Sequence, residues 1–110
     1  MPNDIKNIVI TAAARTPIGT FRGSLKEMQA SDLGTLVTKA VIEKSNLKPN
    51  DVDELIMGQV LTAATGQNPA RQVAIQAGLP VEKTAYVINQ VCGSGLRSVA
   101  AGYQSIISND

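Results

Sequence analysis

The 110-residue sequence contains no histidine and no tryptophan, a single cysteine, and only three aromatic residues. Without histidine, the usual cysteine–histidine pair of nucleophilic catalysis cannot form within this chain. A single cysteine excludes an internal disulfide bond, and the chain offers no clustered cysteine and histidine ligands for a metal. We therefore expect no metal site and a reducing compartment.

Long apolar runs and clusters of like charge are also missing. The longest apolar stretches are too short to span a bilayer, and the N-terminus lacks the basic and apolar regions of a secretory signal. Ten basic and nine acidic residues are scattered along the chain and leave a net charge of +1. We therefore expect a cytoplasmic protein that binds neither nucleic acid nor a membrane surface.

The residues that are present predict one folded α/β domain. Apolar residues make up 44% of the chain and charged residues 17%, which is typical of globular proteins. Strand-like runs lie at 8–14, 54–61 and 84–91, and helical periodicity follows each of them, at 31–44, 68–78 and 94–107. The order β-α-β-α-β-α predicts parallel strands in a layered α/β domain, with the first strand buried.

Local signals mark the ends of these helices. Ser31 or Asp32 can cap the first helix. Asn68 suits the N-cap of the second helix, Pro69 suits its first position, and Gly78 suits its end.

The single cysteine, Cys92, lies on a turn between the third expected strand and the third expected helix. Unpaired N–H groups and the helix dipole at such a position favour a thiolate. Gly93 and Gly95 permit a sharp turn and the close approach of a substrate, and the same N–H groups can stabilise an oxyanion. A lone cysteine is nevertheless more often a packing residue, so position alone leaves both interpretations open.

Other motifs that contain these glycines are excluded. Ser98 stands where a dinucleotide-binding fingerprint needs its third glycine. A nucleophile elbow centred on Ser94 needs glycine at positions 92 and 96, where Cys92 and Leu96 stand. If this turn carries out chemistry, its cysteine is the reacting group.

Two further segments contain clustered polar side chains. "GQNPARQ" is a possible binding loop with four polar residues, but a capped helix start explains most of it; the four are Gln67, Asn68, Arg71 and Gln72. Arg15 and Arg22 of "ARTPIGTFRG" are candidates for phosphate contact, although solvated arginines of a surface loop are the simpler interpretation. We assign no cofactor-binding residue in either segment.

Five motifs together resemble one known family. In order they are "ARTPIGTFRGSL", "ASDLG", "PNDVDELIMGQVL", "GQNPARQVAIQAGLP" and "NQVCGSGL". With them, essentially the whole chain closely resembles the N-terminal part of the thiolases, above all the acetyl-CoA acetyltransferases. The resemblance implies that residues 1–110 form an incomplete thiolase N-terminal domain, the start of a layered α-β-α-β-α fold.

The resemblance also implies a catalytic role for Cys92. In thiolases the cysteine of this turn is acylated by an acyl-CoA thioester, and its own N–H contributes to an oxyanion hole. The enolate of a second acetyl-CoA then attacks in a Claisen condensation, which gives acetoacetyl-CoA, and thiolysis is the reverse reaction. Coenzyme A thioesters are thus expected as substrates, with no permanently bound cofactor.

The sequence departs from the family by what it does not contain. The histidine of a Gly-His-Pro motif, an asparagine-containing motif and a second, acid/base cysteine are absent, so we expect the 110-residue chain alone to be inactive. The family further implies a homodimer or homotetramer in which the strand from Thr84 to Val91 pairs with its own copy.

Two alternatives stay open. One is a catalytically incomplete segment or dimerisation module. The other is a related condensing enzyme or a 3-ketoacyl-CoA thiolase of other chain length, because the residues that set chain length are expected beyond Asp110.

Overall fold

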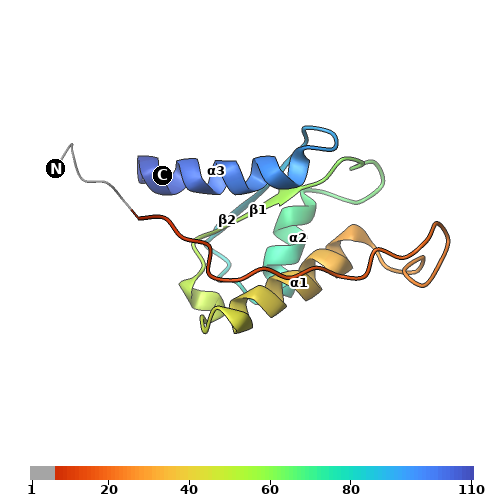
Figure 1. The fold of residues 1–110 in the computed structure, drawn as a ribbon, viewed down its shortest axis with the longest axis horizontal. Helices are drawn as coiled ribbons and strands as arrows, with labels where there is room; N and C mark the ends of the chain where they lie inside the picture. The colour runs from red at the N-terminus through yellow and green to blue at the C-terminus, as the bar shows by residue number, and fades with distance from the viewer. Residues whose placement is uncertain (1–6) are drawn as a thin grey trace.

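The structure, a computed structural model, describes residues 7–110 and has parallel α/β architecture (Figure 1). Its elements are α1 (Ala30–Lys44), a 3₁₀ turn (Pro49–Asp51), β1 (Glu54–Gly58), α2 (Pro69–Gln76), β2 (Thr84–Ile88) and α3 (Ser94–Ser108). The strands pair in parallel, with Glu54 opposite Thr84 and Gly58 opposite Ile88. The predicted α/β class and the parallel pairing are confirmed.

Helices cover both faces of this small sheet. Alternate strand residues point to opposite faces: Leu55 and Ala85 pack against a core contributed by α1 and α2 and the residues that follow α2. The buried members of that core are Ile42, Ala74, Ala77 and Leu79. Ile56 points the other way, toward Gly102 of α3. The sheet therefore lies between α3 on one side and α2 with α1 on the other (Figure 1).

The two helices on the same side pack closely at a glycine. A Cβ on Gly34 of α1 would lie 2.9 Å from Cγ2 of Val73 in α2, and Val73 is almost completely buried. Close packing of this kind explains why α1 has no side chain at this position.

The structure confirms the predicted ends of α2 and corrects the predicted N-cap of α1. Asn68 caps α2, accepting from the Arg71 N–H at 3.3 Å, and Pro69 and Gly78 occupy the predicted positions. At α1 the N-cap is Gln29, whose N–H donates to the Asp32 carboxylate at 2.8 Å. Asp32 thus acts at the predicted end, whereas Ser31 lies inside the helix.

The strand expected at residues 8–14 does not form, so this prediction is wrong. Residues 7–20 contain no strand or helix, and Val9 and Ile10 are exposed. A strand forms only where a neighbouring strand satisfies its backbone N–H and C=O groups, and the described sheet holds β1 and β2 alone. Instead, Ile8, Val9 and Ile10 line a hollow of about 310 Å³ together with side chains of α3.

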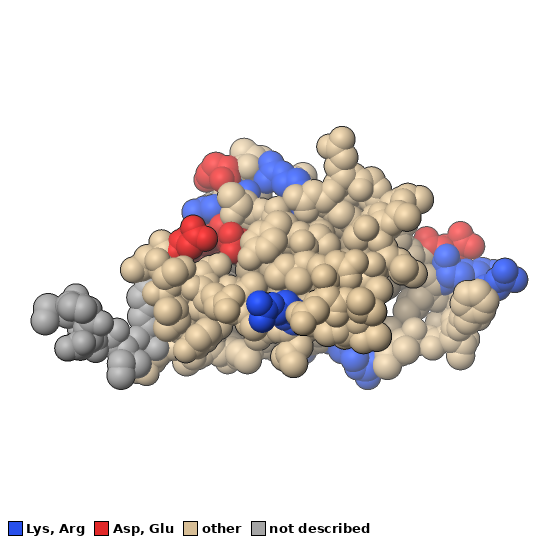
Figure 2. Space-filling model, turned by 90° about the horizontal axis from the view of Figure 1, so that it is seen from above, with Lys and Arg blue, Asp and Glu red and all other residues tan. Residues whose placement is uncertain are grey.

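Helix α3 places small residues against the sheet and its large apolar residues outward. Ser94 is buried, and Ser98, Ala101 and Ser105 are partly buried, while the exposed large residues are Leu96, Val99, Tyr103, Ile106 and Ile107. Viewed from the α3 side, most of the central surface is uncharged (Figure 2). Among residues 7–110 we find no helix long and apolar enough to cross a membrane.

Candidate active site

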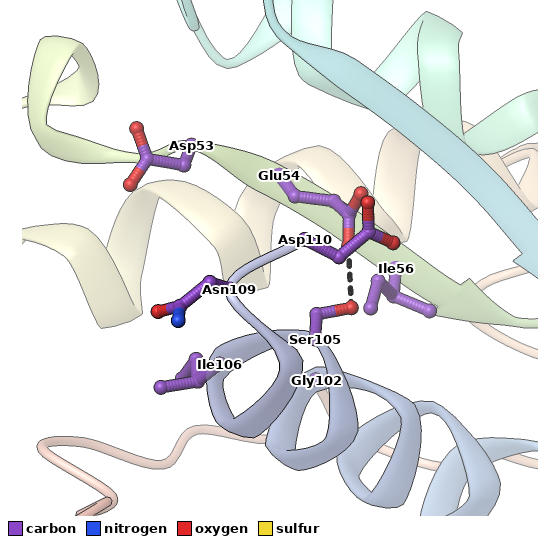
Figure 3. Close-up of a pocket in the computed structure, with 8 residues that line it drawn as sticks. All are labelled: Asp53, Glu54, Ile56, Gly102, Ser105, Ile106, Asn109 and Asp110. Atoms are coloured by element: carbon purple, nitrogen blue, oxygen red, sulfur yellow. Dashed lines mark hydrogen bonds between the residues drawn. The ribbon is translucent and has the colours of Figure 1, made fainter. Parts of the chain in front are cut away.

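A large hollow lies at the C-terminal end of α3 (Figure 3). It measures about 490 Å³ and is lined by Asp53, Glu54, Ile56, Gly102, Ser105, Ile106, Asn109 and Asp110. The Glu54 carboxylate accepts from Ser105 at 3.3 Å and from Thr84 at 3.0 Å, and Asp53 pairs with Lys83 at 3.0 Å. The Glu54 carboxylate therefore links β1 to β2 and α3, which is a structural role.

Cys92 lies at the opposite end of α3, where the polar loop after β2 turns into the helix. Its side chain is exposed and not disulfide-bonded, and the N-cap of α3 is the next residue, Gly93. The predicted position of Cys92, on a turn directly before a helix N-terminus, is confirmed.

The backbone before Cys92 is strained. Val91 has φ +49°, a left-handed conformation that is a genuine outlier for a β-branched residue. The Val91 N–H donates to Oδ1 of Asn89 at 2.9 Å, and the amide nitrogen of Asn89 donates to the Val60 carbonyl at 2.9 Å. Asn89 thus ties the turn to the chain that follows β1.

The first residue of α3 closes the turn from the other side. Ser94 is buried, and its hydroxyl accepts from the Gln90 N–H at 2.8 Å and donates to the Val91 carbonyl at 2.6 Å. Cys92 itself lies within the loop that these two hydrogen bonds enclose.

Backbone N–H groups at this turn divide into occupied and available donors. The Gly93 N–H donates to the Gln90 carbonyl at 3.0 Å, and the Ser94 N–H donates to the Val91 carbonyl at 3.1 Å. Within residues 7–110, the N–H groups of Cys92, Gly95 and Leu96 make no backbone hydrogen bond outside the helix. Donors of this kind, next to a nucleophile, can stabilise an oxyanion.

Strand β1 supports the turn from behind. A Cβ on Gly58 would lie 2.4 Å from the carbonyl carbon and 2.5 Å from the carbonyl oxygen of Ser94. Only glycine allows β1 to approach the start of α3 this closely. The sequence analysis did not identify Gly58, Asn89 and Ser94 as residues that support the turn. Of the three, only Gly58 carries a signal in the sequence, because a glycine inside a strand indicates a close approach of another backbone.

The polar residues of "GQNPARQ" serve the fold. Asn68 donates to the Ala85 carbonyl at 2.9 Å, besides capping α2. The Arg71 guanidinium donates to two carbonyls before β2, and the Gln72 amide donates to two carbonyls before α2. These bonds account for three of the four polar side chains, as expected for a capped helix start.

The described contacts of the two loop arginines lie within their own loop. Arg15 donates to the neighbouring Thr16 carbonyl at 3.0 Å, and Arg22 lies over the ring of Phe21, 5.3 Å from its centroid. Both belong to the segment before α1, so the described contacts support the surface-loop interpretation.

The class of protein follows from the fold and from the turn at Cys92. The chain is an α/β protein with an accessible cysteine at a strand-to-helix turn. Residues 8–110 match the family model of the thiolase N-terminal domain. The chain belongs to the thiolase family.

Individual relatives agree with this assignment. The chain is 57% identical over 102 residues to an acetyl-CoA acetyltransferase of Paracoccus denitrificans, and 54% identical over 102 residues to a probable acetyl-CoA acetyltransferase of Escherichia coli. Each alignment covers 93% of this chain and 26% of the relative. The chain therefore spans about a quarter of the length of the curated relatives it matches.

A solved structure gives the same result for the fold. The Acat5 thiolase from Ascaris suum, in complex with coenzyme A, matches with a TM-score of 0.88 and 41% sequence identity. The match covers 89% of this chain and 26% of that one. The fold is thus the N-terminal portion of a thiolase fold.

Proposed function

We propose that Cys92 is the acyl-accepting nucleophile of an acetyl-CoA C-acetyltransferase. The observation that carries the proposal is its exposed thiol at the N-terminus of α3, in a chain 50–57% identical to acetyl-CoA acetyltransferases. The N–H groups near the thiol support the same role, because an oxyanion forms when a thiolate attacks a carbonyl.

The reaction has two halves. The Cys92 thiolate attacks the carbonyl carbon of acetyl-CoA, a new C–S bond forms, and the bond to the coenzyme A sulfur breaks, which releases the coenzyme A thiolate to be protonated. A second acetyl-CoA then loses a methyl proton to a base, and its enolate attacks the acetyl group on Cys92. The products are acetoacetyl-CoA and the free Cys92 thiolate; thiolysis runs the same steps in reverse.

This chain does not supply that base in the form the family uses. It contains no histidine and no second cysteine. We propose that residues 1–110 act within a polypeptide of the relatives' length, of which they form the first part of the N-terminal domain. The outward apolar side of α3 supports this, because exposed apolar patches of this kind mark surfaces that another part of a protein covers.

Self-association through β2 is part of the same proposal. The strand expected from Thr84 to Val91 ends at Ile88 in the structure, so Thr84–Ile88 is the segment that would pair. β2 is hydrogen-bonded to β1 along one edge in the described sheet, and pairing its other edge with a second copy gives an isologous dimer. Sedimentation of the native gene product tests this: we expect a dimer or tetramer, and a monomer at working concentration contradicts it.

Kinetics of the native gene product test the catalytic role. We expect acetoacetyl-CoA formation from acetyl-CoA, and its loss in Cys92→Ala, with Ser108→Ala, at the far end of α3, as the matched control. Equal activity of Cys92→Ala and the parent contradicts the proposal. Faster thiolysis of longer 3-ketoacyl-CoA substrates than of acetoacetyl-CoA favours a thiolase of other chain length, and an inactive native product favours a dimerisation module.

A further inference from the structure

Ser94 stands directly behind the Cys92 turn, at the first position of α3. Its side chain is only 3% exposed. The hydroxyl oxygen accepts from the Gln90 N–H at 2.8 Å, and the hydroxyl proton is donated to the Val91 carbonyl at 2.6 Å. Both partners belong to the loop that leads into Cys92, so one hydroxyl fixes that loop to the helix.

The loop needs such a support because Val91 does not favour its own conformation. A φ of +49° is sterically costly for a branched side chain. Val91 is 63% exposed, so burial of its side chain contributes little to holding it there. What remains is hydrogen bonding: Asn89 accepts from its N–H, and its carbonyl accepts from both the hydroxyl and the N–H of Ser94.

Ser94 is itself packed against strand β1. Gly58 lets β1 contact the Ser94 carbonyl with no side chain between them. The backbones of β1 and Ser94 are therefore in direct contact, and close packing of this kind limits how far the Ser94 hydroxyl can move.

We propose that Ser94 is a positioning residue for Cys92. Together with the Asn89 side chain and its own N–H, the Ser94 hydroxyl keeps Val91 in the left-handed conformation. The conformation of Val91 sets where the Cys92 thiol lies relative to the N–H groups beside it. Ser94 contacts no substrate in this role. The proposal rests on the proposed function of Cys92 as nucleophile, and it adds the residue that holds the nucleophile in place.

The test compares two serines of the same helix in the native gene product. Ser94→Ala removes the hydroxyl behind the turn. Ser98→Ala is the control, since its hydroxyl donates to the Gly95 carbonyl at 2.6 Å, one turn further along. We measure alkylation of Cys92 by iodoacetamide, the rate of acetylation at saturating acetyl-CoA, the KM for acetyl-CoA and the melting temperature.

We expect Ser94→Ala to slow both reactions of the thiol about tenfold, since two hydrogen bonds to the loop are lost. The KM for acetyl-CoA should stay within about twofold of the parent value, because Ser94 does not bind substrate. Ser98→Ala should change neither reaction. Equal rates for the two variants overturn the proposal.

A second variant tests the mechanism and protects against a folding failure. Val91→Gly replaces the strained residue with glycine, which tolerates a positive φ without steric cost. In the Val91→Gly background, Ser94→Ala should slow alkylation and acetylation of Cys92 by about twofold or less. Glycine adopts the positive φ without steric cost, so the hydroxyl is no longer needed to maintain it. If Ser94→Ala alone does not fold, the double variant and Val91→Gly carry the comparison. A full tenfold effect in the glycine background overturns the proposal.

The two proposals fail differently. If acetyl-CoA does not acetylate the parent protein, but Ser94→Ala slows alkylation relative to Ser98→Ala, then Ser94 positions a thiol that is not an acyl acceptor. If the parent is acetylated and the two serine variants react equally, Cys92 is the nucleophile and Ser94 does not position it.

Discussion

A methyl group at Gly58 should separate β1 from the start of α3. The added Cβ of Gly58→Ala would lie 2.4 Å from the Ser94 carbonyl carbon and 2.6 Å from the Gly95 nitrogen. Both are backbone atoms, so no side-chain rotation can relieve the contact. Ordinary contacts begin near 3.4 Å, and the start of α3 would therefore have to move by about 1 Å.

The cost follows from two opposing effects. Overpacking of this kind destabilises by about 1–3 kcal/mol, and replacing glycine by alanine restricts the unfolded chain, which returns about 0.4–1 kcal/mol. We expect Gly58→Ala to lower the free energy of unfolding by about 1–2 kcal/mol. Acylation of Cys92 should slow as well, because Ser94 moves together with its hydroxyl.

Gly102→Ala is the matched control in the same interface between α3 and β1. Its Cβ would meet only Cδ1 of Ile56, at 4.0 Å, an ordinary contact. Alanine inside a helix is favoured over glycine by about 0.5–1 kcal/mol, so this variant should be slightly stabilised. Urea unfolding of the native gene product gives both values. If Gly58→Ala is as stable as Gly102→Ala, the close approach of β1 to α3 is refuted.

Three further predictions concern side chains that hold the fold. Asn68→Ala should destabilise by about 1–2 kcal/mol, because it removes the α2 cap. The backbone at this position has φ +41°, so Asn68→Gly should recover part of the loss in thermal unfolding, and equal melting of the two variants contradicts this. Arg71→Lys should destabilise by about 1 kcal/mol, since lysine lacks the planar fork of arginine. That fork reaches both the Val81 and Lys83 carbonyls, and unchanged urea unfolding would show that it does not contribute. Asp53→Asn should alter stability by less than about 0.5 kcal/mol, because an exposed ion pair is screened by solvent. The Asp53 side chain is 88% exposed in its pair with Lys83, and a larger, salt-dependent loss would show that the pair is not screened.

Features governed by local chemistry could be predicted from the sequence. Asn68 and Pro69 start a helix through their own hydrogen bonds and φ preference, and Gly78 ends it. Likewise, placing Cys92 at a helix N-terminus requires only that a strand-like run be followed by helical periodicity. The parallel pairing of β1 and β2 follows from the helix that connects them.

Features governed by distant neighbours could not be predicted in the same way. Residues 8–10 have strand-like composition, yet strand formation depends on a partner strand that no local pattern specifies. The periodicity of α3 identifies an apolar face, but whether that face meets the sheet depends on the small residues of the opposite face. The strain at Val91 and the two bonds of Ser94 exist only once β2 and α3 are in place.

The most direct test of the central claim is to locate the acetyl group. The native gene product is incubated with acetyl-CoA, quenched and digested, and its peptides are analysed by mass spectrometry. We expect one acetyl group on the peptide that contains Cys92, removable by neutral hydroxylamine as a thioester and absent from Cys92→Ala. Acetyl transfer to other residues, with Cys92 unmodified, would contradict the claim that Cys92 is the nucleophile.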